Sequence, residues 1–89
     1  MRVTRETSKF KKDVKRMQKR GKDFNAFKEI IVKLASGRKL DPKHRDHLLV
    51  GEYKDSRECH IAPDWLLIYE LGEREIVLIR TGTHADLFE

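Results

Sequence analysis

The sequence contains a single cysteine and no long apolar segment among its 89 residues. Cys59 cannot form an internal disulfide, which fits a reducing compartment, and its thiol is expected to be a small buried hydrophobic group. No apolar run approaches the roughly 20 residues that span a bilayer, and the first ten residues lack the apolar middle of a secretory signal. We therefore expect a cytoplasmic protein that does not enter the membrane.

Acidic residues are scarce in the first half of the chain. Residues 1–45 carry 16 Lys and Arg against 5 Asp and Glu, a net charge of +11, whereas residues 46–89 carry 4 against 10, a net charge of −6. A basic helix is ordinarily just a solvated face, but eight Lys and Arg with one acid within residues 9–22 favour a polyanionic partner. Clustered cations bind phosphates and release counterions, so the first half predicts a nucleic-acid-binding surface.

Apolar residues at helical spacing predict a helical hairpin over about residues 8–36. Phe10, Val14 and Met17 form one narrow stripe that begins after a Thr7 or Ser8 cap. The second helix is marked by a longer series, namely Phe24, Phe27, Ile30, Ile31 and Leu34. Because only the short segment RGKD separates the two, we expect antiparallel helices whose apolar stripes cover a sheet.

The pattern changes to short strands over about residues 48–82, after the polar loop LDPKHRDH. The predicted strands are LLVGEY, RECHIA, WLLIYE and EIVLIRT, and their tight connections imply antiparallel pairing. The last two are nearly continuous apolar runs, which favours a central position. Residues 83–89 are expected to form a C-terminal turn. The predicted fold class is α+β, in one domain over residues 1–89: a short N-terminal strand and a helical hairpin packed on an antiparallel sheet of three to four strands.

Histidines in loops and at strand ends are the first candidates for chemistry. His47 lies in the polar loop, His60 ends a strand before a Pro-Asp step, and His84 follows the last strand. If neighbouring strands bring these and Asp64 together, they form an acid-base constellation. RNA cleavage requires a base for the 2′-OH, a cation for the phosphorane and an acid for the 5′-oxygen, and imidazole suits both proton roles. No metal or cofactor is needed for such a reaction.

Cations and aromatic residues near these histidines are candidates for RNA binding. Arg80 on the last strand, with Arg57 and Lys54, can face a phosphate. Trp65 or Phe88 can stack on a splayed base, which contributes ~1–3 kcal/mol per base.

Each candidate also has a structural interpretation. Strand-end histidines are ordinarily surface residues, Asp64 follows a proline as turn formers do, and Trp65 opens an apolar strand as core residues do. Arg80 can equally be an edge charge. A zinc site of His44 and His47 with the Cys59-His60 pair is disfavoured, because adjacent strand residues point to opposite faces.

Two segments extend the interpretation beyond residue types. HIAPDWLLIYE and IRTGTHADLF closely resemble the YafQ branch of the RelE/ParE toxin superfamily, whose members carry His-x-x-Pro-Asp-Trp-(apolar)-Leu-Ile-Tyr and Arg-Thr-Gly-Thr-His-x-x-Leu-Phe. The upstream segment DHLLVGEYKDSRECH matches as well, so the resemblance is tight over about residues 46–88 and topological over the helices. It implies a RelE-like fold, that is, a microbial-ribonuclease-like sheet with a helical hairpin on one face.

The resemblance implies a bacterial type II toxin that is a metal-independent endoribonuclease without a cofactor. Such a toxin enters the A site of the 70S ribosome, cuts translated mRNA, and is held inactive by a cognate antitoxin, through which alone it meets DNA. By motif, the functional histidines fall on His47, His60 and His84, and the carboxylate falls on Asp64. We assign His84 as general acid, Asp64 with His60 as base and orienting group, and His47 as the residue that positions or protonates the phosphate.

The matched motifs assign the remaining site residues as well. Arg80 lies within RTGTH and is expected to be the transition-state cation, and the family's aromatic residues fall on Trp65 and Phe88. His44 has no counterpart, and Leu48 stands where these toxins often carry proline.

The charge asymmetry then suggests ribosomal RNA for the basic hairpin and an acidic antitoxin segment for the cations near the site. Two alternatives stay open: a non-catalytic ParE-like inhibitor of DNA gyrase, and a module that only binds RNA or an antitoxin. Clustered groups that titrate near neutrality favour the enzyme over either binder.

Overall fold

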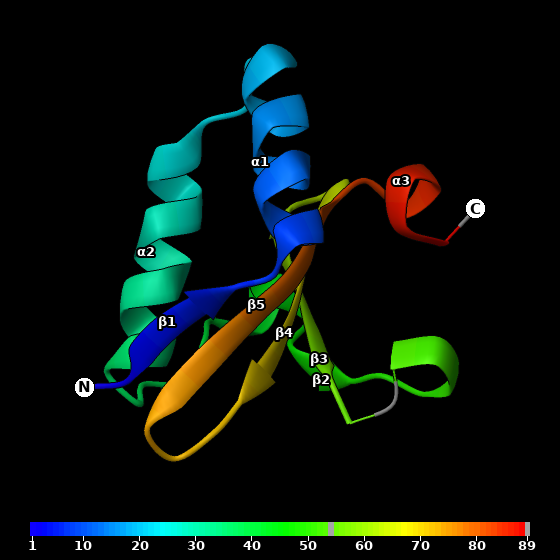
Figure 1. Ribbon diagram of the computed structural model, residues 1–89. Coiled ribbons are helices and arrows are strands. Elements are labelled where there is room, and N and C mark those ends of the chain that lie inside the picture. Colours follow the sequence, from blue (N-terminus) through cyan, green and yellow to red (C-terminus); the bar gives the residue numbers. More distant parts are fainter. Residues whose placement is uncertain (54, 89) are drawn as a thin grey trace.

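The computed structural model describes residues 1–53 and 55–88, except for the side chain of Glu52. A five-stranded sheet of order β1-β5-β4-β3-β2 carries α1 (Ser8–Lys19) and α2 (Phe24–Ala35) on one face, and the short α3 (His84–Phe88) lies beside α1, on the side away from α2 (Figure 1). The strands and single 3₁₀ turns are β1 (Val3–Glu6), η1 (Pro42–His44), β2 (His47–Leu48), η2 (Gly51–Tyr53), β3 (Arg57–Ala62), β4 (Trp65–Leu71) and β5 (Glu75–Gly82).

The predicted helical hairpin is confirmed, and each helix begins at a side-chain cap. The Thr7 hydroxyl accepts the backbone N–H of Phe10 at 3.0 Å, and the Asp23 carboxylate accepts that of Asn25 at 2.9 Å. After α1, Gly21 has a φ of 76°, which a residue with a side chain rarely adopts. In the described part of the chain, no helix is long and apolar enough to cross a membrane.

The α+β class is confirmed, but the sheet differs from the expected one. It has five strands and is mixed, because β1 pairs in parallel with β5 over Val3–Glu6. The predicted strand LLVGEY was largely wrong: only His47–Leu48 pairs with β3, and Gly51–Tyr53 forms η2. Gly51 has a φ of 81°, which is incompatible with an extended strand. β3, β4 and β5 are antiparallel neighbours, as predicted.

β4 separates two hydrophobic cores. Trp65 and Leu67 belong to the larger core beneath α1 and α2, whereas Leu66 and Ile68 pack with Leu87 of α3 on the opposite face. All four β4 side chains are buried, so both faces of this strand are covered, as its continuous apolar run predicted. The second, smaller core matters for function because it holds α3 against the face that the two long helices leave open.

Candidate active site

A row of residues crosses four strands on the sheet face opposite α1 and α2. Glu58 of β3 pairs with His47 of β2 on one side and with Ile68 of β4 on the other, and Ile68 pairs with Arg80 of β5. Neighbouring strands lie about 4.8 Å apart, so the backbones of Glu58 and Arg80 are separated by roughly 10 Å, within reach of their long side chains. The sheet therefore presents an imidazole, a carboxylate and a guanidinium along one line.

A second row brings His60 and His84 to the same end of this face. His60 pairs with Leu66, which pairs with Gly82, and His84 follows two residues later at the start of α3. Asp64, in the turn between β3 and β4, accepts the backbone N–H of His84 at 3.4 Å. The strand register thus brings the backbone of His60 and the start of α3 to the same end of the sheet, and Asp64 contacts the backbone of α3.

His47 and His60 lie on either side of the Glu58 carboxylate. Their Nε2 atoms are 3.6 Å and 3.8 Å from the same oxygen, Glu58 Oε1. The Glu58 side chain is only 5% exposed, whereas that of His47 is 50% exposed. Sequence reasoning missed Glu58, although its place two residues before His60 puts both side chains on one face of the strand.

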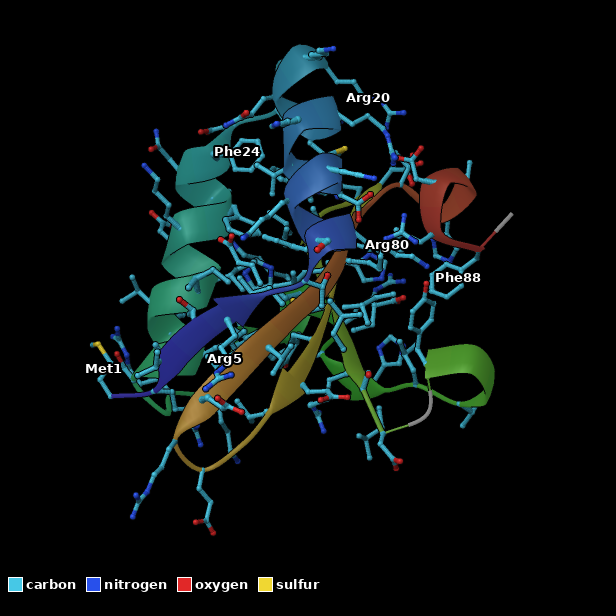
Figure 2. All side chains as sticks on the ribbon, viewed as in Figure 1. Met1, Arg5, Arg20, Phe24, Arg80 and Phe88 are labelled. Carbon is cyan, nitrogen blue, oxygen red and sulfur yellow. The ribbon has the colours of Figure 1, made fainter. Side chains whose placement is uncertain are left out.

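Arg80 is held by a buried carboxylate of α1. Its Nε and Nη2 donate to Asp13 at 2.6 and 3.1 Å, and the same carboxylate accepts the Thr81 N–H at 3.2 Å. Hydrogen bonding to Asp13 raises the pKa of Arg80, with a smaller contribution from Tyr53, so the guanidinium stays charged. Arg80 is therefore a braced cation between α1 and α3 and not a loose edge charge (Figure 2). Asp13, only 1% exposed, is a second residue that sequence reasoning did not find.

Two aromatic contacts define the outer rim at α3. The Phe88 ring lies 6.0 Å from that of Tyr53, nearly perpendicular to it at 87°, and 5.4 Å from the imidazole of His84. Phe88 is 44% exposed although its neighbour Leu87 is buried. Figure 2 shows Phe88 at the outer edge of the molecule, at the end of α3. An exposed ring beside an imidazole is suited to stacking on a nucleobase.

An ion pair attaches α3 to α1. Arg20 donates two hydrogen bonds to Asp86, at 2.6 and 3.0 Å. Asp86 also accepts the N–H of Thr83 at 2.9 Å, and these bonds, Arg20 first, hold the pKa of Asp86 well below its ordinary value. Gly82 is needed here, because a Cβ at that position would lie 2.9 Å from Asp86 Cβ.

The structure overturns the expectation that Trp65 stacks on RNA. The side chain is 2% exposed, its Nε1 donates to the Thr81 hydroxyl at 2.8 Å, and its ring meets that of Phe24 edge-on at 5.0 Å. It points toward the helices because it begins β4 on the face that α1 and α2 cover. The structural interpretation, a core tryptophan, is therefore correct.

The expectation that Arg57 faces the RNA phosphate is also corrected. Arg57 precedes Glu58 on the strand, so its side chain emerges on the helix side, opposite the candidate site. There its Nε donates to Asp46 at 3.1 Å, a carboxylate that also accepts the Tyr69 hydroxyl at 2.6 Å. The hydrogen bond to Asp46 raises the pKa of Arg57. Lys54, the other predicted cation, lies outside the described residues.

His44 has a structural contact. Its Nδ1 donates to the backbone carbonyl of His60 at 2.7 Å, which joins η1 to β3.

Cys59, the strand residue before His60, is 0% exposed, and burial raises the pKa of its thiol. Among residues 1–53 and 55–88, no group of three His, Cys, Asp or Glu side chains is arranged to hold a metal ion.

Known proteins resemble the whole chain and not only its strand motifs. The sequence model of the family described as "Bacterial toxin of type II toxin-antitoxin system, YafQ" matches residues 2–89. The mRNA interferase toxin YafQ of Escherichia coli strain K12 is 42% identical over 83 residues, which is 92% of this chain and 90% of that protein.

Solved structures agree with the family match. The Escherichia coli DinJ-YafQ complex contains a chain that is 40% identical with a TM-score of 0.91, and the match covers 100% of both chains. A copper-bound mutant toxin from Helicobacter pylori is 38% identical with a TM-score of 0.93, over 99% of this chain and 100% of that one. The helical half, for which the sequence motifs were not diagnostic, therefore has the same fold as these toxins.

Proposed function

The chain belongs to the YafQ family of bacterial toxins from type II toxin-antitoxin systems, and from this membership we propose that it is an mRNA interferase, an endoribonuclease that stops translation and growth. The observation that carries the proposal is the open sheet face. There, His47 and His60 flank one carboxylate, Arg80 lies two strands away, and His84 stands at the same end as His60. These are the proton-transfer and charge-stabilising groups that cleavage of an RNA phosphodiester requires.

In the proposed mechanism, the histidines move protons and Arg80 stabilises charge. The imidazole of His60 removes the 2′-OH proton as the oxygen attacks phosphorus, and His47 positions or protonates the phosphate. Arg80 faces the negative charge that develops on the phosphorane, and His84 protonates the leaving 5′-oxygen. Asp64, which accepts the His84 N–H, orients the acid by holding the first residue of α3. The steps use side-chain protons and a fixed cation, so we propose cleavage without a metal or other cofactor.

Substrate binding is assigned to the exposed rim. Phe88 replaces Trp65 as the stacking residue, because its ring is accessible and lies beside the proposed acid. Stacking of one base on such a ring contributes about 1–3 kcal/mol. In this position it would hold the nucleotide on the His84 side of the scissile bond.

The partners proposed are a cognate antitoxin and the 70S ribosome, in the bacterial cytoplasm. The Escherichia coli relative is solved in complex with DinJ, which supports an antitoxin for this chain. The basic first half of the sequence suits ribosomal RNA, and contact with DNA is expected only through the antitoxin.

The test is primer extension on a translated mRNA, with and without ribosomes, using toxin that has been treated with EDTA and then dialysed into the Mg²⁺ buffer that ribosomes require. We expect discrete cuts only with ribosomes, at the same rate for treated and untreated toxin. His84→Ala should lower the cleavage rate by about 10²–10⁴-fold while the protein stays folded, because Leu87 still anchors α3. Glu73→Gln, an exposed change in the β4–β5 turn, is the control and should cut normally.

The outcomes separate the competing functions. Intact transcripts together with blocked gyrase supercoiling would favour the ParE-like alternative. Intact transcripts with unimpaired supercoiling would leave a module that only binds RNA or an antitoxin. Cuts that His84→Ala does not reduce would contradict the assignment of the general acid.

A further inference from the structure

A cavity lined mostly by cations lies on the helix side of the sheet, at the end away from α3 (Figure 1). It has a volume of about 440 Å³ and is bordered by the C-terminal end of α2, the segment 37–42, the start of β3 and the end of β4. Five cations line it against two carboxylates, and these residues are Arg2, Arg38, Lys39, Arg45 and Arg57, with Asp41 and Asp46. The cavity therefore carries a net charge of +3 and attracts an anion.

Both carboxylates of the cavity are bound by neighbouring groups. Asp46 accepts Arg57 Nε at 3.1 Å and the Tyr69 hydroxyl at 2.6 Å, so the charges of Asp46 and Arg57 neutralise each other. Asp41 caps η1 by accepting the backbone N–H of Lys43 at 3.1 Å. The excess positive charge of the cavity therefore belongs to the other four cations.

The C-terminal carbonyls of α2 would by themselves repel an anion, but Arg2 covers them. Its Nη1 donates to the Leu34 carbonyl at 3.0 Å, and its backbone N–H donates to the Ala35 carbonyl at 2.8 Å. A guanidinium held against the last turn offsets the negative end of the helix dipole. The positive potential of the cavity thus extends up to α2.

Three cations of the cavity remain without an acidic partner. Arg38, Lys39 and Arg45 are exposed, and no carboxylate among the described side chains lies within 4.0 Å of their side-chain nitrogens. Arg45 also has a φ of 49°, in the left-handed region that favours glycine or asparagine. Three neighbouring like charges, one of them on a strained backbone, destabilise the fold unless an anion neutralises them, so the cluster indicates a ligand.

We propose that this cavity binds a backbone phosphate of RNA through Arg38, Lys39 and Arg45. The inference rests on the proposed ribonuclease function and adds a binding site on the sheet face opposite the histidines. A phosphodiester presents two charged oxygens, which match the fork of a guanidinium and the point charge of an ammonium. RNA is favoured over an acidic antitoxin segment because the cavity lies on the same side of the sheet as the exposed lysines of α1, so one long polyanion can follow both.

The test is binding of the double variant Arg38→Gln/Lys39→Gln to ribosomes that carry no mRNA. Arg45 is left intact, because its carbonyl accepts His47 Nδ1 at 2.6 Å. Loss of one phosphate contact should lower the slope of log affinity against log salt concentration by about 0.7–0.9, and the affinity near 0.1 M salt by about 3- to 10-fold. The cleavage rate at saturating toxin should stay as in the wild type. Arg38→Lys should retain most of the slope, and Arg74→Gln, outside the cavity, is the control with wild-type binding.

A titration of the free protein gives a readout that depends on neither ribosomes nor cleavage. The probe is a DNA hexamer, which has backbone phosphates but no 2′-OH and so cannot be cleaved by this chemistry. In NMR spectra, the backbone amides of Gly37, Leu40 and Arg45 should shift as the hexamer is added to the wild type. The same amides should shift several-fold less in the folded double variant at equal hexamer concentration.

The outcomes identify the source of the phosphate and separate the two levels of inference. Weaker binding to mRNA-free ribosomes assigns the phosphate to ribosomal RNA. Unchanged binding there, with weaker binding of a 2′-deoxy-substituted mRNA on ribosomes, assigns it to the mRNA. If the wild type cleaves mRNA but the double variant binds ribosomes, mRNA and the hexamer normally, or loses affinity only for the antitoxin, the phosphate site is overturned and the proposed function stands. If the wild type does not cleave at all, the proposed function fails, and the hexamer titration alone decides whether the cavity binds a phosphate.

Discussion

At the scale of single residues, Trp65 and Phe88 are the aromatic residues of two different motifs, and we assign the first to stability and the second to RNA binding. Trp65 is 2% exposed and hydrogen-bonded, whereas Phe88 is 44% exposed at the rim of the candidate site. We predict that Trp65→Phe lowers the free energy of unfolding by about 1–2 kcal/mol, through the lost hydrogen bond and poorer packing, and leaves cleavage intact. Phe88→Ala should do the opposite, with stability within about 0.5 kcal/mol and cleavage reduced about tenfold or more.

Urea unfolding and cleavage assays on the two variants check this contrast. Each variant is the other's control, because both reduce aromatic surface, one in the core beneath the helices and one at the rim of the candidate site. Equal losses of cleavage in two well-folded variants would mean that Trp65 also contacts RNA, in conflict with its burial.

The sequence pointed to the histidines of the candidate site, but it did not point to two of its acidic residues. His47, His60 and His84 were marked by their location at loops and strand ends, where side chains are accessible. Glu58 and Asp13 were not, because an acid in a strand or in a basic helix ordinarily faces water. Asp13 did carry a signal: it lies three residues after Phe10 and four before Met17, within the apolar stripe of α1.

At the scale of elements, the Asp13–Arg80 pair joins α1 to β5. The two side chains are 2% and 16% exposed, so removal of one charge leaves the other buried and unpaired. We predict that Asp13→Asn lowers the free energy of unfolding by about 3–5 kcal/mol. It should also slow cleavage, because the guanidinium loses the partner that orients it.

Chemical unfolding and single-turnover cleavage measure these two effects. The matched control is Asp23→Asn, since Asn caps a helix as well as Asp and this residue caps α2. If Asp13→Asn proves as stable as Asp23→Asn, the pair does not brace the two elements.

A second link between elements, Arg20–Asp86, predicts a dependence of stability on pH. The pKa of Asp86 is lowered in the folded state, so its ionised form stabilises the fold above the unfolded value of about 3.9, and this contribution is lost as pH falls through the lower folded value. Asp86→Asn should therefore be less stable than the wild type near neutrality. The difference should narrow progressively below about pH 4.

Thermal unfolding from neutral to acidic pH tests this expectation, with Glu70→Gln on an exposed strand position as control. A gap between the wild type and Asp86→Asn that stays constant down to strongly acidic pH would show that the carboxylate is not the linked group.

The local sequence pattern predicted helices and strands well where each element packs against or pairs with the next element along the chain. The hairpin of helices and the strands β3, β4 and β5 follow from periodicity and short connections. β1 was expected, but its parallel partner β5 lies about 70 residues away, and nothing local specifies that pairing. The strand expected at LLVGEY does not form beyond Leu48. The backbone turns away from the extended conformation there, with positive φ at Gly51 and, just after the segment, at Asp55.

At the scale of the whole molecule, the two charge halves are arranged around one sheet. The basic half forms α1 and α2, and the more acidic half forms the strands β2–β5 that carry the candidate site. On the proposed function, a polyanion is bound by the helices while the candidate site on the opposite face carries the chemistry. This separation suits a protein that must dock on RNA and cut a different segment of RNA.

The charge arrangement predicts salt-dependent binding to ribosomes through the helices. Lys11, Lys12 and Lys15 of α1 are exposed, and each phosphate contact contributes about 0.7–0.9 to the slope of log affinity against log salt concentration. Replacing all three lysines with Gln should lower the slope by up to about 2–3 and weaken co-sedimentation with ribosomes between about 50 and 200 mM salt. The single-turnover cleavage rate at saturating toxin should stay as in the wild type, because the substitutions lie on the other side of the sheet.

Arg74→Gln is the control, since this arginine lies in the exposed turn between β4 and β5, outside α1. An equal change of slope per charge removed in Arg74→Gln and in the triple variant would mean that only net charge matters. A change confined to the triple variant, with a wild-type cleavage rate at saturating toxin, would show that docking and cleavage are carried by opposite faces of the sheet, so that each can be altered without the other.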